Sequence, residues 1–163
     1  MPFLLLNDGA KLTDWINTFS LAAGSGRLIS EKLFHFIQQL RIPELQWIDF
    51  DLKNHKEKYY FVNIISQQTD EYIDFKRSSF ELEPGHSRVH VSSKEDYFRI
   101  ITENPSRYVD WTDLYFNERI FDSYDLVRIG FGSVSWYVSD RVQKTMTEFS
   151  GLRFTPVNNI HLP

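Results

Sequence analysis

The run Tyr59-Tyr60-Phe61-Val62-Asn63-Ile64-Ile65 constrains the fold of this chain more than any other segment. It consists of aromatic and β-branched residues, which favour strands, with one polar side chain among them. A strand this apolar needs cover on both of its faces, so it does not suit the exposed edge of a sheet. We therefore expect residues 59–65 to lie near the centre of a sheet.

Two segments have the pattern of amphipathic helices that could cover this sheet. The first follows Ser30, a favourable N-cap, and runs to Arg41 before Pro43. The second follows Ser139 and stops at Gly151. Their apolar faces contain Leu33, Phe34, Ile37 and Leu40 in the first helix, and Val142, Met146 and Phe149 in the second. With 163 residues, a length that suits one domain, the sequence predicts a single α+β domain over residues 1–163. Its sheet is expected to be mixed or antiparallel, with both helices packed on it.

Shorter segments complete the expected architecture with weaker patterns. We expect strands at residues 3–6, 45–52, 72–75, 80–82, 88–91, 126–131, 134–138 and 152–157, and further helices at 12–19 and 94–101. In the segment 45–52, Ile48 and Phe50 alternate with acids, which is typical of a half-buried strand. Residues 108–121 show neither the helical period of 3.6 residues nor the strand period of two. Residues 158–163 are expected to form a loose tail.

The two helices also resemble each other at an offset of 109 residues, from Ser30 to Ser139. The sequence Ile29-Ser30-Glu31-Lys32-Leu33 is similar to Val138-Ser139-Asp140-Arg141-Val142, and Leu45 and Ile48 fall on Phe154 and Val157. One interpretation is two related helix-then-strand units. The other is that any amphipathic helix with a Ser cap would show this similarity.

Charge and composition argue against several classes of partner. The formal net charge is −4 and no run of Lys or Arg occurs, so neither nucleic acid nor an anionic membrane is expected to bind. The chain has no Cys, which removes thiol catalysis and fits a reducing compartment. The apolar opening, residues 1–6, is too short for a signal sequence or a membrane span. These features favour the cytoplasm.

The sequence offers no recognisable catalytic or metal site. His86 and His90 are close in sequence, but on a strand an i, i+4 pair spans roughly 13 Å, too far for one ion. The segment 24–26 lacks the Lys-Ser/Thr of a P-loop, and 130–133 lacks the third Gly of a dinucleotide site. We therefore expect no catalytic residues, no metal and no cofactor.

A stretch of acids interleaved with aromatics, from Asp110 to Asp125, is the candidate partner-binding segment. Its acids can steer a basic partner and its aromatics can anchor one. The candidate residues are Asp110, Trp111, Asp113, Tyr115, Glu118, Asp122, Tyr124 and Asp125. The alternative is that the aromatics fill the core and the acids are merely solvated. A second candidate surface contains Asp49, Asp51, Asp70, Glu71 and Asp74.

Several segments resemble immunity-protein family eleven of bacterial polymorphic toxin systems. The clearest are 136–142 (Trp-Tyr-Val-Ser-Asp-Arg-Val) and 151–157 (Gly-Leu-Arg-Phe-Thr-Pro-Val). Further similarities are at 28–33, 59–64 and 72–78, so the resemblance spans most of residues 28–157. Residues 97–122 and 1–27 match poorly.

The resemblance implies a small cytoplasmic antidote that binds a cognate protein toxin, possibly a basic one, and neutralises it without catalysis. It implies no catalytic residues. Two other classes stay open at this point: a small-ligand-binding or regulatory module, which needs a deep aromatic pocket, and an enzyme with scattered catalytic groups. The sequence does not specify the toxin or the oligomeric state.

Overall fold

A central strand organises the first sheet of the chain, in the part that the computed structural model describes: residues 3–4, 11–16, 26–52, 55–131 and 135–163. The apolar run forms β5 (Lys58–Ile64), and the strand order is β1-β4-β5-β3-β2. β5 thus lies between β4 (Leu45–Leu52) and β3 (Arg27–Ser30), antiparallel to both. The outer strands are β1 (Phe3–Leu4), parallel to β4, and β2 (Trp15–Ile16). The predicted central position of this strand is confirmed.

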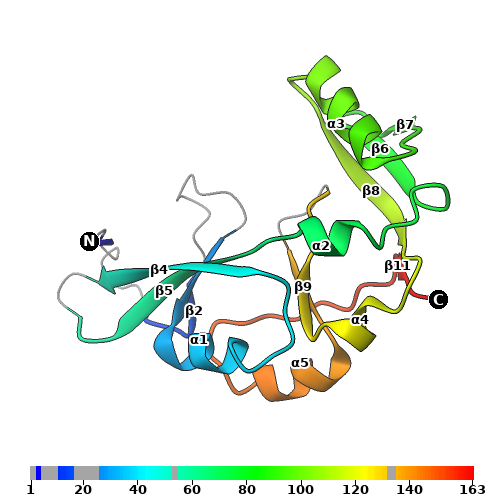
Figure 1. The fold of residues 1–163 in the computed structure, drawn as a ribbon. Coiled ribbons are helices and arrows are strands. Elements are labelled where there is room, and N and C mark those ends of the chain that lie inside the picture. Colours follow the sequence, from blue (N-terminus) through cyan, green and yellow to red (C-terminus); the bar gives the residue numbers. More distant parts are fainter. Residues whose placement is uncertain (1–2, 5–10, 17–25, 53–54, 132–134) are drawn as a thin grey trace.

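Helices α1 (Glu31–Ile37) and α5 (Asp140–Met146) lie side by side against this sheet (Figure 1). The Ser30 hydroxyl accepts a hydrogen bond from the Leu33 N–H at 3.2 Å, which is the N-cap that the sequence predicts. The residues predicted to be buried on the two helices, Leu33, Ile37, Val142, Met146 and Phe149, share one core with Val62 and Ile64 of β5. None of the described helices is long and apolar enough to cross a membrane.

Each of these helices is the last element of a structural unit. In chain order, a unit consists of an Asp, two paired strands, a Ser and the helix that follows it. The backbone N–H of Ser30 donates to the Asp14 carbonyl at 2.9 Å, and that of Ser139 donates to the Asp125 carbonyl at 3.1 Å. Each Asp then caps the end of the other unit. The Asp14 carboxylate accepts from the Ser150 N–H at 2.9 Å, and the Asp125 carboxylate accepts from the Arg41 N–H at 3.0 Å. The two units are therefore related by an approximate two-fold arrangement.

This arrangement corrects the predicted helix-then-strand repeat. The two similar sequence segments do form equivalent helices, but in each unit the paired strands come before the helix and not after it. In the second unit they are β9 (Leu126–Arg128) and β10 (Trp136–Val138), paired antiparallel as predicted. The predicted strand at 152–157 is wrong, because these residues pair with no strand in the described part of the chain.

A second sheet stands to one side of the first (Figure 1). Its strand order is β11-β8-β6-β7, and α3 (Lys94–Glu103) packs on it through Tyr97 and Ile100. The strands are β6 (Ser79–Glu83), β7 (Ser87–Val89), β8 (Tyr108–Tyr115) and β11 (Ile160–His161). Short helices α2 (Gln67–Asp70) and α4 (Ile120–Ser123) lie in the connections. The whole chain is an α+β protein.

β9 links the two cores because neighbouring side chains of a strand point to opposite faces. Leu126 belongs to the core of α1 and α5, whereas Val127 belongs to the core of the second sheet. The Thr69 hydroxyl donates to the Arg128 carbonyl at 2.5 Å, so α2 is tied to the same strand. The two cores are therefore joined through a buried strand.

Four further predictions differ from the structure. Trp15 and Ile16 form β2 and not a helix, because they pair with β3; the rest of the predicted helix lies largely outside the described residues. Residues 72–75 form turns with an isolated bridge from Ile73 to Phe116. The predicted loose tail contains β11. Residues 108–121 contain β8, whose alternation is hidden because most of its side chains are partly buried on both faces.

Two described glycines, Gly85 and Gly151, have positive φ, and Gly151 has the more crowded surroundings. Its φ is +84°, and an added Cβ would lie 2.6 Å from the Trp15 carbonyl oxygen. Gly85 also has positive φ, +122°, but an added Cβ there would be 3.3 Å from the flexible Arg107 side chain. We expect Gly151→Ala to lower the free energy of unfolding by about 2–3 kcal/mol and Gly85→Ala by about 1 kcal/mol. Urea titrations measure both, and equal losses would show that the Trp15 contact does not constrain this site.

Candidate partner-binding surface

The predicted acidic segment is divided among several environments, and the structure does not bring its residues together on one surface. Asp110, Trp111, Asp113 and Tyr115 lie on β8, Glu118 precedes α4, Asp122 lies within α4, and Tyr124 and Asp125 follow it. Glu118 and Asp122 are exposed, and the others are partly or fully buried. The segment therefore offers two solvent-exposed acids.

Asp125 has a structural environment at the junction of the two units. It is only 3% exposed and is hydrogen-bonded by the Arg41 backbone, by the Arg41 guanidinium at 2.9 Å and by Arg141. The Arg41 hydrogen bonds outweigh burial and hold the pKa of this carboxyl well below its usual range. Asp125 is thus a charged tie within the fold.

The aromatic residues of the segment also have partners within the chain. The Trp111 indole N–H donates to the Phe131 carbonyl at 3.0 Å. Tyr115 stacks on His161 with ring centroids 4.2 Å apart, and the Arg77 guanidinium lies 4.4 Å from the centre of the Tyr115 ring. Tyr124 contacts Tyr72 edge-on. These contacts match the alternative in which the aromatics serve packing.

A group of metal-ligating side chains lies where the sequence pattern did not suggest one. His86 approaches Glu81 at 3.3 Å and Glu83 at 2.5 Å, so the hairpin of β6 and β7 supplies the acidic pair that the spacing of His86 and His90 did not reveal. Asp110 lies across from Glu81, and burial together with the charges of Glu83 and Glu81 raises its pKa. The sequence signal for this group was the two-residue spacing of Glu81 and Glu83, which places both side chains on one face of a strand. The Nδ1 atom of His86 lies within hydrogen-bonding distance of both Glu81 and Glu83, so the three side chains already contact one another.

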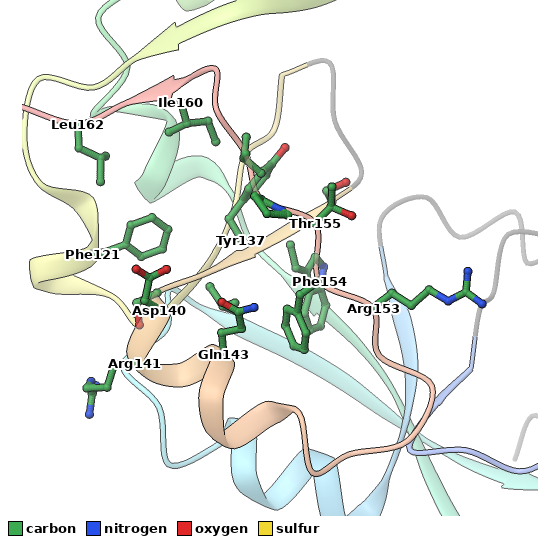
Figure 2. Close-up of a pocket in the computed structure, with 16 residues that line it drawn as sticks. Phe121, Tyr137, Asp140, Arg141, Gln143, Arg153, Phe154, Thr155, Ile160 and Leu162 are labelled. Carbon is green, nitrogen blue, oxygen red and sulfur yellow. The ribbon is translucent and has the colours of Figure 1, made fainter.

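A cavity of about 810 Å³ separates the start of α5 from the C-terminal segment (Figure 2). Its lining includes Phe121, Tyr137, Phe154, Ile160 and Leu162. Figure 2 shows Arg141 and Arg153 directed away from it, whereas Asp140, Gln143 and Thr155 line it together with the apolar side chains. This lining suits a mostly apolar small molecule that carries a polar group.

Two large apolar side chains that are more than half exposed lie next to each other in sequence on β4, and a third, Tyr108, lies at the start of β8. Trp47 is 51% exposed and Ile48 is 56% exposed, although the sequence predicted that Ile48 would be half buried. Exposed Glu44, Asp49 and Asp51 flank them. We call these five residues the β4 surface. It includes Asp49 and Asp51 of the second predicted surface, whereas Asp70 of that surface is buried and bonded to the Gly130 N–H at 2.9 Å.

Comparisons with family models, with curated proteins and with solved structures find no match to this chain.

Proposed function

We propose that this chain is a non-catalytic immunity protein that binds a protein toxin in the cytoplasm and neutralises it. The observation that carries the proposal is the β4 surface, where Trp47 on one face of the strand and Ile48 on the other are both more than half exposed, with three acids beside them. Large exposed apolar side chains rimmed by charge are typical of protein-binding sites. The resemblance of residues 28–157 to an immunity-protein family supports the same class of function.

The proposed mechanism divides the work between charge and apolar contact. The acids Glu44, Asp49 and Asp51 attract a basic toxin surface and raise the association rate. Trp47 and Ile48 then lose their exposed area to the toxin and slow its dissociation. Neutralisation follows when the bound chain covers the active site of the toxin or holds it inactive.

Three acids with a shifted pKa have partners within the fold that account for the shift. Asp125 and Asp14 both have a lowered pKa, and both cap backbone N–H groups of the opposite unit. At Asp14, hydrogen bonds from Ser30 and Ser150 outweigh the opposing effect of burial. Burial raises the pKa of Asp70, which is bonded to Gly130 and Ser66. All three acids are engaged in holding the fold.

The cavity beside α5 favours a second candidate, the binding of a small, mostly apolar ligand. Its volume of about 810 Å³ is within the range of ordinary ligand pockets. A fluorescent apolar probe such as anilinonaphthalene sulfonate distinguishes the candidates, since Tyr137→Ala would change its binding only if the cavity is its site. Trp47→Ala is the matched control outside the cavity.

Protection of growing cells tests the proposal. The proposal expects the upstream neighbouring gene to encode a toxic domain, so the chain is co-expressed with the product of that gene and growth is measured. We expect the wild-type chain to restore growth and Trp47→Ala combined with Asp49→Lys to restore much less. Asp122→Lys, an exposed acid outside the β4 surface, is the matched control and is expected to protect fully.

Circular dichroism first establishes that each variant is folded. If the β4 variant protects as well as wild type, the β4 surface is not the interface. Loss of protection with Asp122→Lys alone would instead place the interface on the predicted acidic segment.

A further inference from the structure

The edge of β4 is open along most of its length, within the part of the chain that the structure describes. β1 pairs only with Asp51 and Leu52, whereas β4 begins at Leu45. The other side of β4 is fully paired with β5. Residues 45–49 therefore have a strand neighbour on one side and no described strand on the other. An unpaired edge of this kind is a template for another strand.

The hydrogen-bond register shows which backbone groups face outward. The Ile65 N–H donates to the Glu44 carbonyl at 2.9 Å. In an antiparallel ladder such bonds join every second pair, so Gln46 and Ile48 bond to Asn63 and Phe61. The N–H and C=O groups of Leu45, Trp47 and Asp49 consequently point away from β5, toward the open edge.

The side chains along this edge separate by chemistry. Because side chains alternate, Trp47, Asp49 and Asp51 share one face of the strand, and Ile48 and Phe50 share the other. An incoming strand would place one set of its side chains beside Trp47 and the two acids, where a basic side chain meets both an aromatic ring and a carboxylate, and the other set beside Ile48 and Phe50. The complementary strand alternates basic and apolar side chains.

We propose that β4 binds its protein partner by strand addition, and that the partner contributes an extended segment with alternating basic and apolar residues. This inference rests on the proposed function in taking the β4 surface as the interface, and it adds the binding mode and the chemistry of the partner. A second copy of this chain is a poorer occupant. Two antiparallel β4 edges paired over residues 45–49 would place Asp49 of one copy opposite Leu45 of the other, so a second copy offers this acid no cation.

A peptide of alternating Lys and Val tests the proposal directly on the wild-type chain. A peptide of roughly seven residues covers the open edge, residues 45–49, with one residue to spare at each end. Two versions carry backbone N-methyl groups, one on the Lys residues and one on the Val residues. Only one set of amides can face β4, so we expect one methylated peptide to lose at least about 10-fold in affinity and the other to bind like the parent.

Binding is followed by nuclear magnetic resonance, with shifts expected at Leu45, Trp47 and Asp49. Two variants extend the test. Asp49→Pro removes an outward N–H, which an edge strand tolerates, and is expected to abolish binding. Asp49→Asn keeps that N–H and is expected to weaken binding several-fold and reduce its salt dependence.

Equal binding of the two methylated peptides, or no binding of the parent peptide, overturns strand addition. Equal binding of a Glu-Val peptide overturns the basic partner. A concentration-dependent dimer that Asp49→Pro dissociates would show that a second copy occupies the edge. If the peptide binds as expected but cells are not protected from the toxin, the edge site stands and the immunity function fails. If the toxin binds and the peptide does not, the immunity function stands and strand addition at the β4 edge fails.

Discussion

Ile37→Ala is expected to lower the free energy of unfolding by about 2–5 kcal/mol, and Met146→Ala by a similar amount. Ile37 is fully buried and Met146 is almost fully buried, each near the end of its helix, in the single core that α1, α5 and β5 share. Truncation removes buried apolar groups and leaves a cavity that close-packed neighbours fill only in part. The similar positions of the two residues in the two units predict similar losses.

Urea unfolding followed by circular dichroism gives both values. Ile48→Ala is the matched control, because Ile48 is more than half exposed and its truncation is expected to cost less than about 0.5 kcal/mol. If Ile37→Ala is as stable as the control, the packing of α1 on the sheet is wrong.

Asp125→Asn is expected to lower the free energy of unfolding by about 2–4 kcal/mol, because a carboxylate that receives several charge-assisted hydrogen bonds is lost. Arg41 and Arg141 are exposed, so water can solvate them and the loss stays below that of a fully buried ion pair. The exposed Asp122→Asn is the control and is expected to be near neutral.

The same carboxylate gives a pH dependence with a definite sign. The folded pKa of Asp125 is depressed, so its contribution is complete above the unfolded pKa of about 3.9 and is lost as the pH falls toward the folded value. We expect wild-type stability to decline below about pH 5, and the decline to be shallower in Asp125→Asn. Identical acid profiles would contradict the assignment of Asp125 as a charged tie.

The elements with strong local signals could be predicted from the sequence. The central strand needed only its apolar composition, and the helices after Ser30 and Ser139 needed their apolar period. The predicted cap forms at Ser30, whereas Ser139 starts its helix with no capping hydrogen bond to its hydroxyl. The helix after Ser93 was predicted from its Ser cap, and the Ser93 hydroxyl accepts from the Asp96 N–H at 3.2 Å. These signals come from residues close together in sequence, so they can be recognised without knowing the contacts made with distant residues.

The elements that depend on partners distant in sequence could not be predicted. β2 and β11 are each two residues long and exist because they pair with β3 and β8. The reciprocal caps of Asp14 and Asp125 join residues 136 and 84 positions apart. A single sequence contains no local signal for such contacts.

The candidate site was the least predictable part for a related reason. Composition identifies acids and aromatics but not which of them face solvent. Asp125 and Trp111 have partners within the chain, whereas Trp47 and Ile48, which looked like ordinary strand residues, are exposed. Exposure depends on which side chains the elements distant in sequence cover, which is a property of the whole fold and not of the segment.

Calorimetric titration of the purified chain with a purified candidate toxin, which the proposal expects a neighbouring gene to encode, tests the central proposal most directly. We predict a one-to-one complex with a Kd of about 100 nM or tighter. We also predict that Trp47→Ala, folded by circular dichroism, weakens it by about 30-fold, as expected for an interface anchor. The absence of a complex with wild type would contradict the immunity function, and unchanged affinity of Trp47→Ala would contradict the β4 surface as its interface.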